Sequence, residues 1–93
     1  MQVKFTLEDT IEWMKSDDYK VRFKAEYWQL VIRMEKARNA IVKFGFDNIN
    51  GKDIWLVEQL NKQFEIMHEY KKILENRAIG SGIDLDNDSV VLW

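Results

Sequence analysis

The stretch DDYKVRFKAEYWQLVIRMEKARNAIVKF, residues 17–44, decides the fold because it predicts one long, uninterrupted helix. It contains neither proline nor glycine, the two residues that most disfavour a helix interior. Its apolar residues recur at alternating steps of four and three, the heptad spacing of a helix that packs along another helix. These residues are Phe23, Tyr27, Leu30, Met34, Ala37, Ile41 and Phe44.

A second helix-forming run, residues 53–79, carries a matching apolar face. The members of that face are Leu56, Leu60, Phe64, Met67, Leu74 and Ala78. The connecting sequence GFDNING, residues 45–51, is rich in turn-forming residues, so Gly45 is expected just past the first helix and Asp53 is expected to cap the second. Because the connection is short, the two helices are predicted to pair as an antiparallel hairpin.

The sequence TLEDTIEWMKS, residues 6–16, predicts a short helix ahead of this hairpin. Thr6 and Asp9 have the spacing of a capping box, with Asp in place of the usual Glu, and the helix is expected over residues 7–15. One of the polar residues at positions 16–18 is then expected to cap the long helix.

The last part of the chain is acidic and is not predicted to be helical. The sequence GSG, residues 80–82, is expected to end the last helix, and residues 83–93 are expected to form a loop with a short strand or an anchoring segment. We therefore predict an all-α fold of one antiparallel helical hairpin with a short N-terminal helix, assembled as a homo-oligomer. Its parts are the N-terminal helix 1–16, the hairpin domain 17–79 and the acidic C-terminal tail 80–93.

Length and composition restrict the class of protein. The 93 residues suffice for one domain with a modest core, and the absence of cysteine excludes disulfides and thiolate metal sites. No apolar run approaches the roughly 20 residues of a membrane-spanning helix. The sequence MQVKFTLEDTIEW at the N-terminus lacks the apolar core and cleavage site of a signal peptide. These features predict a soluble, intracellular protein.

Each long helix carries a second apolar stripe, one more than a simple hairpin requires. The stripe on the first helix comprises Val21, Ala25, Trp28 and Ile32, and that on the second comprises Trp55, Ile66, Ile73 and the edge of Tyr70. The N-terminal helix, with Ile11, Trp13 and Met14, is expected to cover only part of this surface, and large exposed apolar faces mark interfaces. We therefore predict an oligomer interface at Trp28, Ile32, Trp55, Ile66, Tyr70 and Ile73. A single well-filled three-helix bundle remains the alternative.

No residue pattern predicts catalysis, a metal site or a cofactor. His68 is the only histidine and has no serine or cysteine near it in sequence, as a nucleophilic site would require. Glu65 and His68 have the spacing of a bundle metal motif, but no second copy of the motif exists. The sequence DLDND, residues 84–88, resembles the start of a calcium loop, but Ser89 stands where that loop needs glycine. We predict a non-enzymatic protein.

Charge is segregated along the chain although the net charge is only −2. Residues 19–44 contain seven basic and two acidic side chains, and seven minus two gives +5. At 100° per residue, five polar side chains of this helix fall within about 80° of arc, and Tyr19 lies at the border of their arc. The five are Arg22, Gln29, Arg33, Lys36 and Lys43.

Cations beside an aromatic ring are the groups that bind a nucleotide, because cations pair with phosphate and a ring stacks on a base. The alternative is a solvated helix face, in which Glu26 pairs with Arg22 and Glu35 pairs with Arg38. Long duplex nucleic acid is a poor fit, because the chain is acidic overall and has no broad basic surface.

The two helices together resemble a family of small phage proteins, the anti-CBASS cyclic-nucleotide sponges and the related Thoeris-blocking sponges. The resemblance covers about two thirds of the chain. Its shared positions are Tyr19, Arg22, Glu26, Leu30, Arg33 and Lys36 on the first helix, and Leu60, Gln63, Met67, Tyr70, Leu74 and Arg77 on the second.

This resemblance implies a function. Such sponges bind cyclic di- or trinucleotides, or a cyclic ADP-ribose isomer, without cleaving them, and so keep the signal from a defence effector in the cytoplasm of the infected bacterial host. They assemble as symmetric oligomers, commonly hexamers, with ligand pockets between protomers. The ligand-binding residues implied here are Tyr19, Arg22, Arg33, Lys36 and Arg77. The rival interpretations are a helical protein-binding inhibitor or structural interaction protein, and an RNA-binding hairpin.

Overall fold

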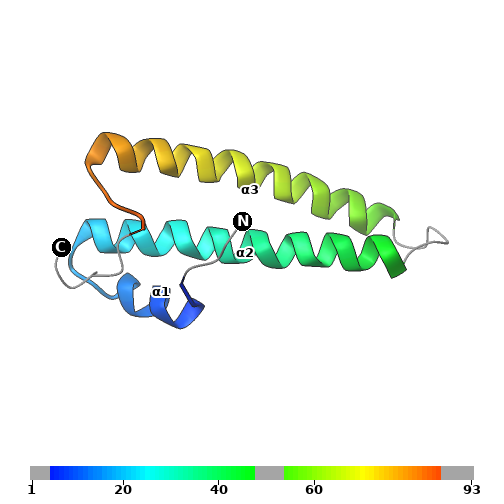
Figure 1. The fold of residues 1–93 in the computed structure, drawn as a ribbon, viewed down its shortest axis with the longest axis horizontal. Helices are drawn as coiled ribbons and strands as arrows, with labels where there is room; N and C mark the ends of the chain where they lie inside the picture. The colour runs from blue at the N-terminus through cyan, green and yellow to red at the C-terminus, as the bar shows by residue number, and fades with distance from the viewer. Residues whose placement is uncertain (1–4, 48–53, 87–93) are drawn as a thin grey trace.

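The computed structural model describes residues 5–47 and 54–86 of the chain. It contains three helices, α1 (Leu7–Met14), α2 (Tyr19–Asp47) and α3 (Ile54–Ser81), and no strand among the described residues. Figure 1 shows α2 in the middle, with α3 antiparallel along one side and α1 on the opposite side. The predicted all-α fold is therefore confirmed.

The start of α1 is fixed by the predicted capping box. The Thr6 hydroxyl accepts a hydrogen bond from the Asp9 backbone N–H at 3.2 Å, and the Asp9 carboxylate accepts one from the Thr6 N–H at 3.0 Å. Two free N–H groups at the helix terminus are thereby satisfied. The helix ends at Met14, with Lys15 as its C-cap.

Asp18 caps α2, one of the candidates that the sequence offered. Its Oδ1 accepts a hydrogen bond from the Lys20 N–H at 2.9 Å, while the Ser16 hydroxyl accepts one from the Asp18 N–H at 3.0 Å. At the other end the prediction was wrong, because α2 continues through Gly45 to Asp47. One helical glycine costs only about 1 kcal/mol, which a long helix tolerates. Asp53, the predicted cap of α3, lies outside the described residues.

The heptad seam forms the contact between α2 and α3, as predicted. On α2 the seam residues Phe23, Tyr27, Leu30, Met34 and Ala37 are buried, and on α3 Leu74 and Ala78 are buried. Met34 and Leu74 are fully buried, whereas Phe64 and Met67 are half-buried at its edge. Burying one large aliphatic side chain contributes about 1.5–3 kcal/mol, so this seam is a principal source of stability for the hairpin.

The second stripe of α2 is also buried within the chain, and the expectation that much of it stays exposed was wrong. Trp28 is 5% exposed and Ile32 is 8% exposed, and Val21 and Ala25 are buried with them. α1 packs against this side of α2. The ring of Phe5 lies edge-on to Trp28, with centroids 5.0 Å apart. Trp28 and Ile32 are therefore too buried to belong to the predicted oligomer interface.

The chain after α3 covers the remainder of Trp28. Gly82 has a φ of 67°, a left-handed conformation that glycine adopts without strain. The Ile83 N–H then donates to Ala78 O at 2.9 Å, which closes a Schellman motif and turns the chain back. Trp28 Nε1 donates to Leu85 O at 2.7 Å. We call residues 82–86 the strap. Trp93 and the rest of the predicted tail lie outside the described residues.

Lys24 is a cation of α2 that the fold removes from the surface. It is fully buried, and its Nζ lies 4.7 Å from the ring centroid of Phe5 and 4.9 Å from that of Trp13. A cation over aromatic faces is attracted by their quadrupoles, most strongly away from water. Lys24 therefore ties the N-terminal segment to α2, and the positive charge that α2 offers to a ligand is smaller than its sequence indicates.

Candidate functional site

Two of the predicted ligand residues meet at one end of the hairpin. Because the helices are antiparallel, the first turn of α2 lies beside the last turns of α3 (Figure 1). The rings of Tyr19 and Phe23 are 6.2 Å apart, and the guanidinium carbon of Arg77 lies 4.9 Å from the Phe23 ring centroid. Phe23 is buried, whereas Tyr19 and Arg77 are exposed. An aromatic ring and a cation are thus held on one buried ring and face solvent.

Arg22 belongs to the same end of the molecule. Its Nη1 donates to Ser16 O at 2.9 Å, which fastens the turn between α1 and α2. A guanidinium has five N–H donors, so this bond leaves others for a ligand. We call Tyr19, Arg22 and Arg77 the end group.

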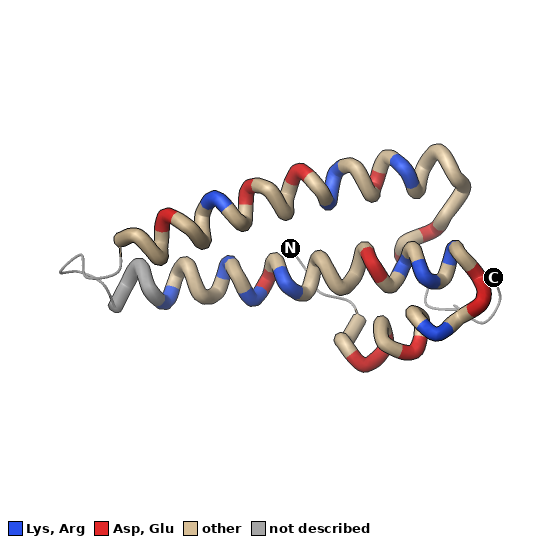
Figure 2. Tube along the Cα trace, turned by 180° about the vertical axis from the view of Figure 1, so that it is seen from behind, with Lys and Arg blue, Asp and Glu red and all other residues tan. Residues whose placement is uncertain are grey.

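Arg33 and Lys36 lie elsewhere, and we call them the mid-helix pair. They follow Arg22 by 11 and 14 residues, which at 1.5 Å per residue corresponds to about 16 and 21 Å along the helix. Both are exposed. Figure 2 shows how the basic residues are distributed along α2. The five predicted ligand residues therefore form two separate groups within one chain.

The sequence suggested two ion pairs within α2, Glu26 with Arg22 and Glu35 with Arg38, and the structure contains only the second. Glu26 accepts a hydrogen bond from the hydroxyl of Tyr70 on α3, rather than pairing with Arg22. This hydrogen bond, more than burial, raises the pKa of Tyr70 above its ordinary value. The suggested pair of Glu35 and Arg38 is present, at 3.8 Å. Among the described residues, Glu26 is thus not paired with Arg22, and the Glu35–Arg38 pair involves no cation of the predicted site.

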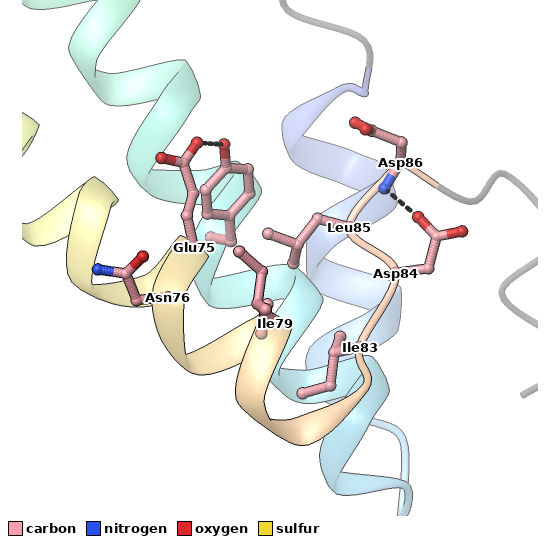
Figure 3. Close-up of a pocket in the computed structure, with 9 residues that line it drawn as sticks. Glu75, Asn76, Ile79, Ile83, Asp84, Leu85 and Asp86 are labelled. Carbon is pink, nitrogen blue, oxygen red and sulfur yellow. Dashed lines mark hydrogen bonds between the residues drawn. The ribbon is translucent and has the colours of Figure 1, made fainter.

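A pocket of about 480 Å³ opens between α3, Tyr27 and the strap (Figure 3). Its lining includes the carboxylates of Glu75, Asp84 and Asp86 and no basic residue. This acidic lining repels phosphate, so the pocket does not fit an anionic ligand. Sequence reasoning missed it because the strap reaches it only by folding back over the end of α3.

Glu75 is the most constrained carboxylate of that pocket. It accepts hydrogen bonds from the Tyr27 hydroxyl at 2.7 Å and from Lys71 Nζ at 3.1 Å. Burial raises the pKa of Glu75, but these two hydrogen bonds outweigh it, and the net pKa is lowered. Burial and the bond to Glu75 raise the pKa of Tyr27 far above its ordinary value. The group is a structural link between α2 and α3.

The predicted interface residues on α3 remain exposed. Trp55 and Ile66 are each 70% exposed, Ile73 is 54% exposed and Tyr70 is 40% exposed. We call these four residues the α3 stripe.

Within residues 5–47 and 54–86, no helix is long and apolar enough to cross a membrane, and no group of three acidic, histidine or cysteine residues could hold a metal ion.

The family model that matches this chain is Sequestin, over residues 17–79. The match spans α2, α3 and their connection and leaves α1 outside. It agrees with the resemblance to sequestering anti-defence proteins that the two helices carry. Comparisons with curated proteins and with solved structures return no match.

Proposed function

The chain belongs to the Sequestin family, and from this premise we propose that it sequesters a cyclic nucleotide signal without cleaving it. The proposed ligands are cyclic di- or trinucleotides or cyclic ADP-ribose isomers that act as immune signals in a phage-infected bacterium. Holding such a signal in the host cytoplasm blocks the defence that depends on it. The family name describes sequestration, which needs affinity and no chemistry.

The observation that carries this proposal is the placement of Tyr19 and Arg77 on the buried ring of Phe23. The exposed Tyr19 ring offers a stacking surface for a base, and base–aromatic stacking contributes about 1–3 kcal/mol. Arg77 and the remaining donors of Arg22 offer charge-assisted hydrogen bonds to phosphate, each of about 1.5–3 kcal/mol. The end group thus combines recognition of a base with recognition of a phosphate.

The mid-helix pair extends the proposed site only under one condition. Arg33 and Lys36 lie about 16 Å or more from the end group along α2, so one ligand does not reach both groups within a single chain. We propose that they contact phosphate across an interface with another copy, as the sponge resemblance implies. The hexamer implied by that resemblance is part of this proposal.

The first test is a thermal-shift panel of the purified chain against cyclic di- and trinucleotides and cyclic ADP-ribose isomers. A ligand at 100 times its dissociation constant stabilises the folded state by about 2.7 kcal/mol, which raises the melting temperature. Denaturing the complex and identifying the released ligand by mass spectrometry then separates binding from cleavage. The proposal fails if no ligand raises the melting temperature, or if the released ligand is cleaved.

Substitutions locate the site once a ligand is identified. Arg77→Ala is expected to weaken binding about 10- to 100-fold, since each 1.4 kcal/mol corresponds to a factor of ten. Tyr19→Ala is expected to weaken binding similarly, whereas Tyr19→Phe retains the ring and most of the affinity. The matched control is Arg38→Ala, which removes an exposed arginine that already pairs with Glu35. Equal losses in Arg38→Ala and Arg77→Ala would indicate an unspecific charge effect.

The exposed α3 stripe favours a second candidate function, a helical inhibitor that binds another protein through an apolar face. The two functions separate cleanly in mutants. Inhibition of a protein partner depends on Trp55 and Ile66 and is indifferent to Tyr19, whereas sequestration depends on Tyr19 and Arg77.

A further inference from the structure

An exposed carboxylate continues the row of contacts that the end group begins. Tyr19, Phe23 and Glu26 follow one another at steps of four and three residues, so they are neighbours on one side of α2. On α3, Tyr70 and Arg77 are seven residues apart, which is about two helical turns on the same side. The Arg77 guanidinium lies over the Phe23 ring, and the Tyr70 hydroxyl donates to Glu26 Oε1. The order along the hairpin is therefore the Tyr19 ring, the Arg77 cation and the Glu26 carboxylate.

The contact with Tyr70 holds Glu26 away from the cation that its own helix offers. Arg22 is four residues before Glu26, a spacing at which opposite charges pair on a helix. The Arg22 guanidinium instead donates to Ser16 O, and Glu26 accepts from the phenol of Tyr70. In residues 5–47 and 54–86 no second hydrogen bond to Glu26 forms, and Glu26 is exposed. A carboxylate has about four lone pairs on two oxygens, so most of its acceptors remain available to a ligand.

A carboxylate does not suit a site that binds phosphate alone, because like charges repel. Glu26 lies one helical turn from Arg22, where its charge would oppose an anion held by that arginine. The base of a nucleotide, by contrast, presents N–H donors at its edge, and carboxylates accept from such donors. Glu26 therefore fits the base of a ligand rather than its phosphate.

The spacing of the row matches a ligand with two bases and a phosphate between them. Tyr19 and Glu26 are seven residues apart, which is about 10.5 Å along α2. Arg77 lies over Phe23, within this interval. A dinucleotide that stacks one base on Tyr19 and places a phosphate at Arg77 brings its other base to Glu26.

Guanine is the base whose edge complements a carboxylate. Its Watson–Crick edge carries two adjacent donors, N1–H and N2–H, and the two oxygens of one carboxylate accept both. Adenine and cytosine each place a ring-nitrogen acceptor beside one amino donor. Uracil has carbonyl acceptors on both sides of its one N–H. In these three bases an acceptor faces a carboxylate oxygen and repels it.

We infer that Glu26 reads a guanine base, so that the end group selects cyclic dinucleotides containing guanine over cyclic nucleotides whose only base is adenine. Tyr70 is a positioning residue, because its hydroxyl holds the carboxylate away from Arg22. The inference rests on the proposed function and deepens it, since it assigns a base to the ligand of the same site. Among the proposed ligands it disfavours cyclic ADP-ribose isomers, which contain adenine alone.

The test is isothermal titration calorimetry of the full chain with cyclic di-GMP and with cyclic di-AMP. The parent chain is expected to bind cyclic di-GMP about 10- to 100-fold more tightly, the discrimination that a bidentate contact to a base provides. Glu26→Gln keeps the size of the side chain but replaces one acceptor with an N–H donor, a pattern that pairs with adenine. This variant is expected to bind cyclic di-GMP more weakly and cyclic di-AMP more tightly than the parent does.

Tyr70→Phe tests the positioning role, because it retains the ring and removes only the hydroxyl. The ratio of the two affinities is expected to fall about threefold or more, since the loss of one hydrogen bond lets Glu26 turn to Arg22. A hydroxyl that only ties the two helices together would change both affinities equally and leave their ratio unchanged. The matched control is Glu12→Gln on α1, which removes an exposed carboxylate that pairs with Lys15 and is expected to change neither affinity.

The outcomes separate this inference from the proposed function. Equal binding of the two ligands by the parent chain, or an unchanged ratio in Glu26→Gln, overturns the inference and leaves the proposed function intact. A chain that binds only adenine-containing ligands of the thermal-shift panel has the same consequence. If no cyclic nucleotide binds, the proposed function fails and the inference fails with it. A preference for cyclic di-GMP that depends on Glu26 supports both.

Discussion

The second apolar stripe of α2 and the stripe of α3 are alike in composition but differ in burial. Each has an aromatic residue and isoleucine at helical spacing, yet Trp28 and Ile32 are buried while Trp55 and Ile66 are mostly exposed. The difference comes from what lies outside the two helices. α1, Phe5 and the strap all pack on α2, and within the described residues nothing covers the stripe of α3. One stripe therefore stabilises the monomer, and the other stays exposed.

The largest expected effect comes from truncating Trp28 of the buried stripe, with truncation of the exposed Trp55 as the comparison. Trp28→Ala is expected to lower the free energy of unfolding by about 3–5 kcal/mol, because it leaves a cavity among Phe5, Tyr27 and the strap. Trp55→Ala is expected to change the free energy of unfolding of the monomer by less than about 0.5 kcal/mol, as for other exposed positions. Urea denaturation at low protein concentration measures both. Similar losses in the two variants would mean that the two stripes are not different in the monomer.

Neighbouring residues of α3 give a second comparison. Leu74 is fully buried against α2, while Ile73 belongs to the exposed α3 stripe. Leu74→Ala is expected to cost about 2–5 kcal/mol through lost burial and a residual cavity. Ile73→Ala is expected to cost less than about 0.5 kcal/mol in the monomer and to weaken self-association. The denaturation midpoints of the two variants, measured with unchanged m-values, provide the check.

The strap can be tested through its turn. Gly82→Ala is expected to cost about 1–2 kcal/mol, because alanine resists a positive φ even though its Cβ would meet no atom within 4 Å. Gly80→Ala, the matched control in the last turn of α3, also meets no atom within 4 Å and is expected to stabilise by about 0.5–1 kcal/mol. Thermal unfolding of the pair gives opposite shifts. A stabilising Gly82→Ala would show that the strap is not held by this turn.

The smallest expected effect is a dependence of stability on pH. The folded pKa of Glu75 is lowered below 4.5, so its contribution is present above that pH and is lost as the pH falls through the folded value. The folded pKa values of Tyr27 and Tyr70 are raised above 10.0, so their contributions are present below that pH and are lost as it rises.

Stability measured by denaturation is therefore expected to be level between these limits and to fall outside them. Glu75→Gln is expected to flatten the decline on the acid side, because it removes the carboxylate that Tyr27 and Lys71 stabilise. Glu69→Gln, which removes a mostly exposed carboxylate, is the control. If stability declines equally at low pH in both variants and in the parent protein, the decline arises from groups other than Glu75.

Much of the fold was predictable because its signals are local. The capping box of Thr6 and Asp9 depends on four consecutive residues, and the seam through Met34 and Leu74 depends on helical spacing alone. The end of α2 was not predictable from Gly45, because a single helical glycine costs less than the packing of a long helix contributes. Local preferences therefore identify elements better than they locate boundaries.

For the candidate site, the sequence indicated which residues to consider but not which of them lie together. The sequence identified Tyr19, Arg22, Arg33, Lys36 and Arg77, and all five are on the surface. It did not indicate that Tyr19 and Arg77 share the ring of Phe23, since these two residues lie far apart in the sequence, at the start of α2 and near the end of α3. It also counted Lys24 among the available cations, although the rings of Phe5 and Trp13 enclose it.

The sequence by itself determined the helices, their antiparallel pairing and the residue types of the proposed ligand-binding surface, because apolar and charged residues recur along it at helical intervals of three and four residues. Only the tertiary structure decided which apolar stripe becomes core and which stays exposed. Whether a stripe is buried depends on where α1 and the strap pack. The strap packs on Trp28 because the Schellman turn at Gly82 reverses the chain direction after α3. The hydrogen bond between Trp28 and Leu85 joins residues 57 positions apart, a separation over which local sequence preferences carry no information.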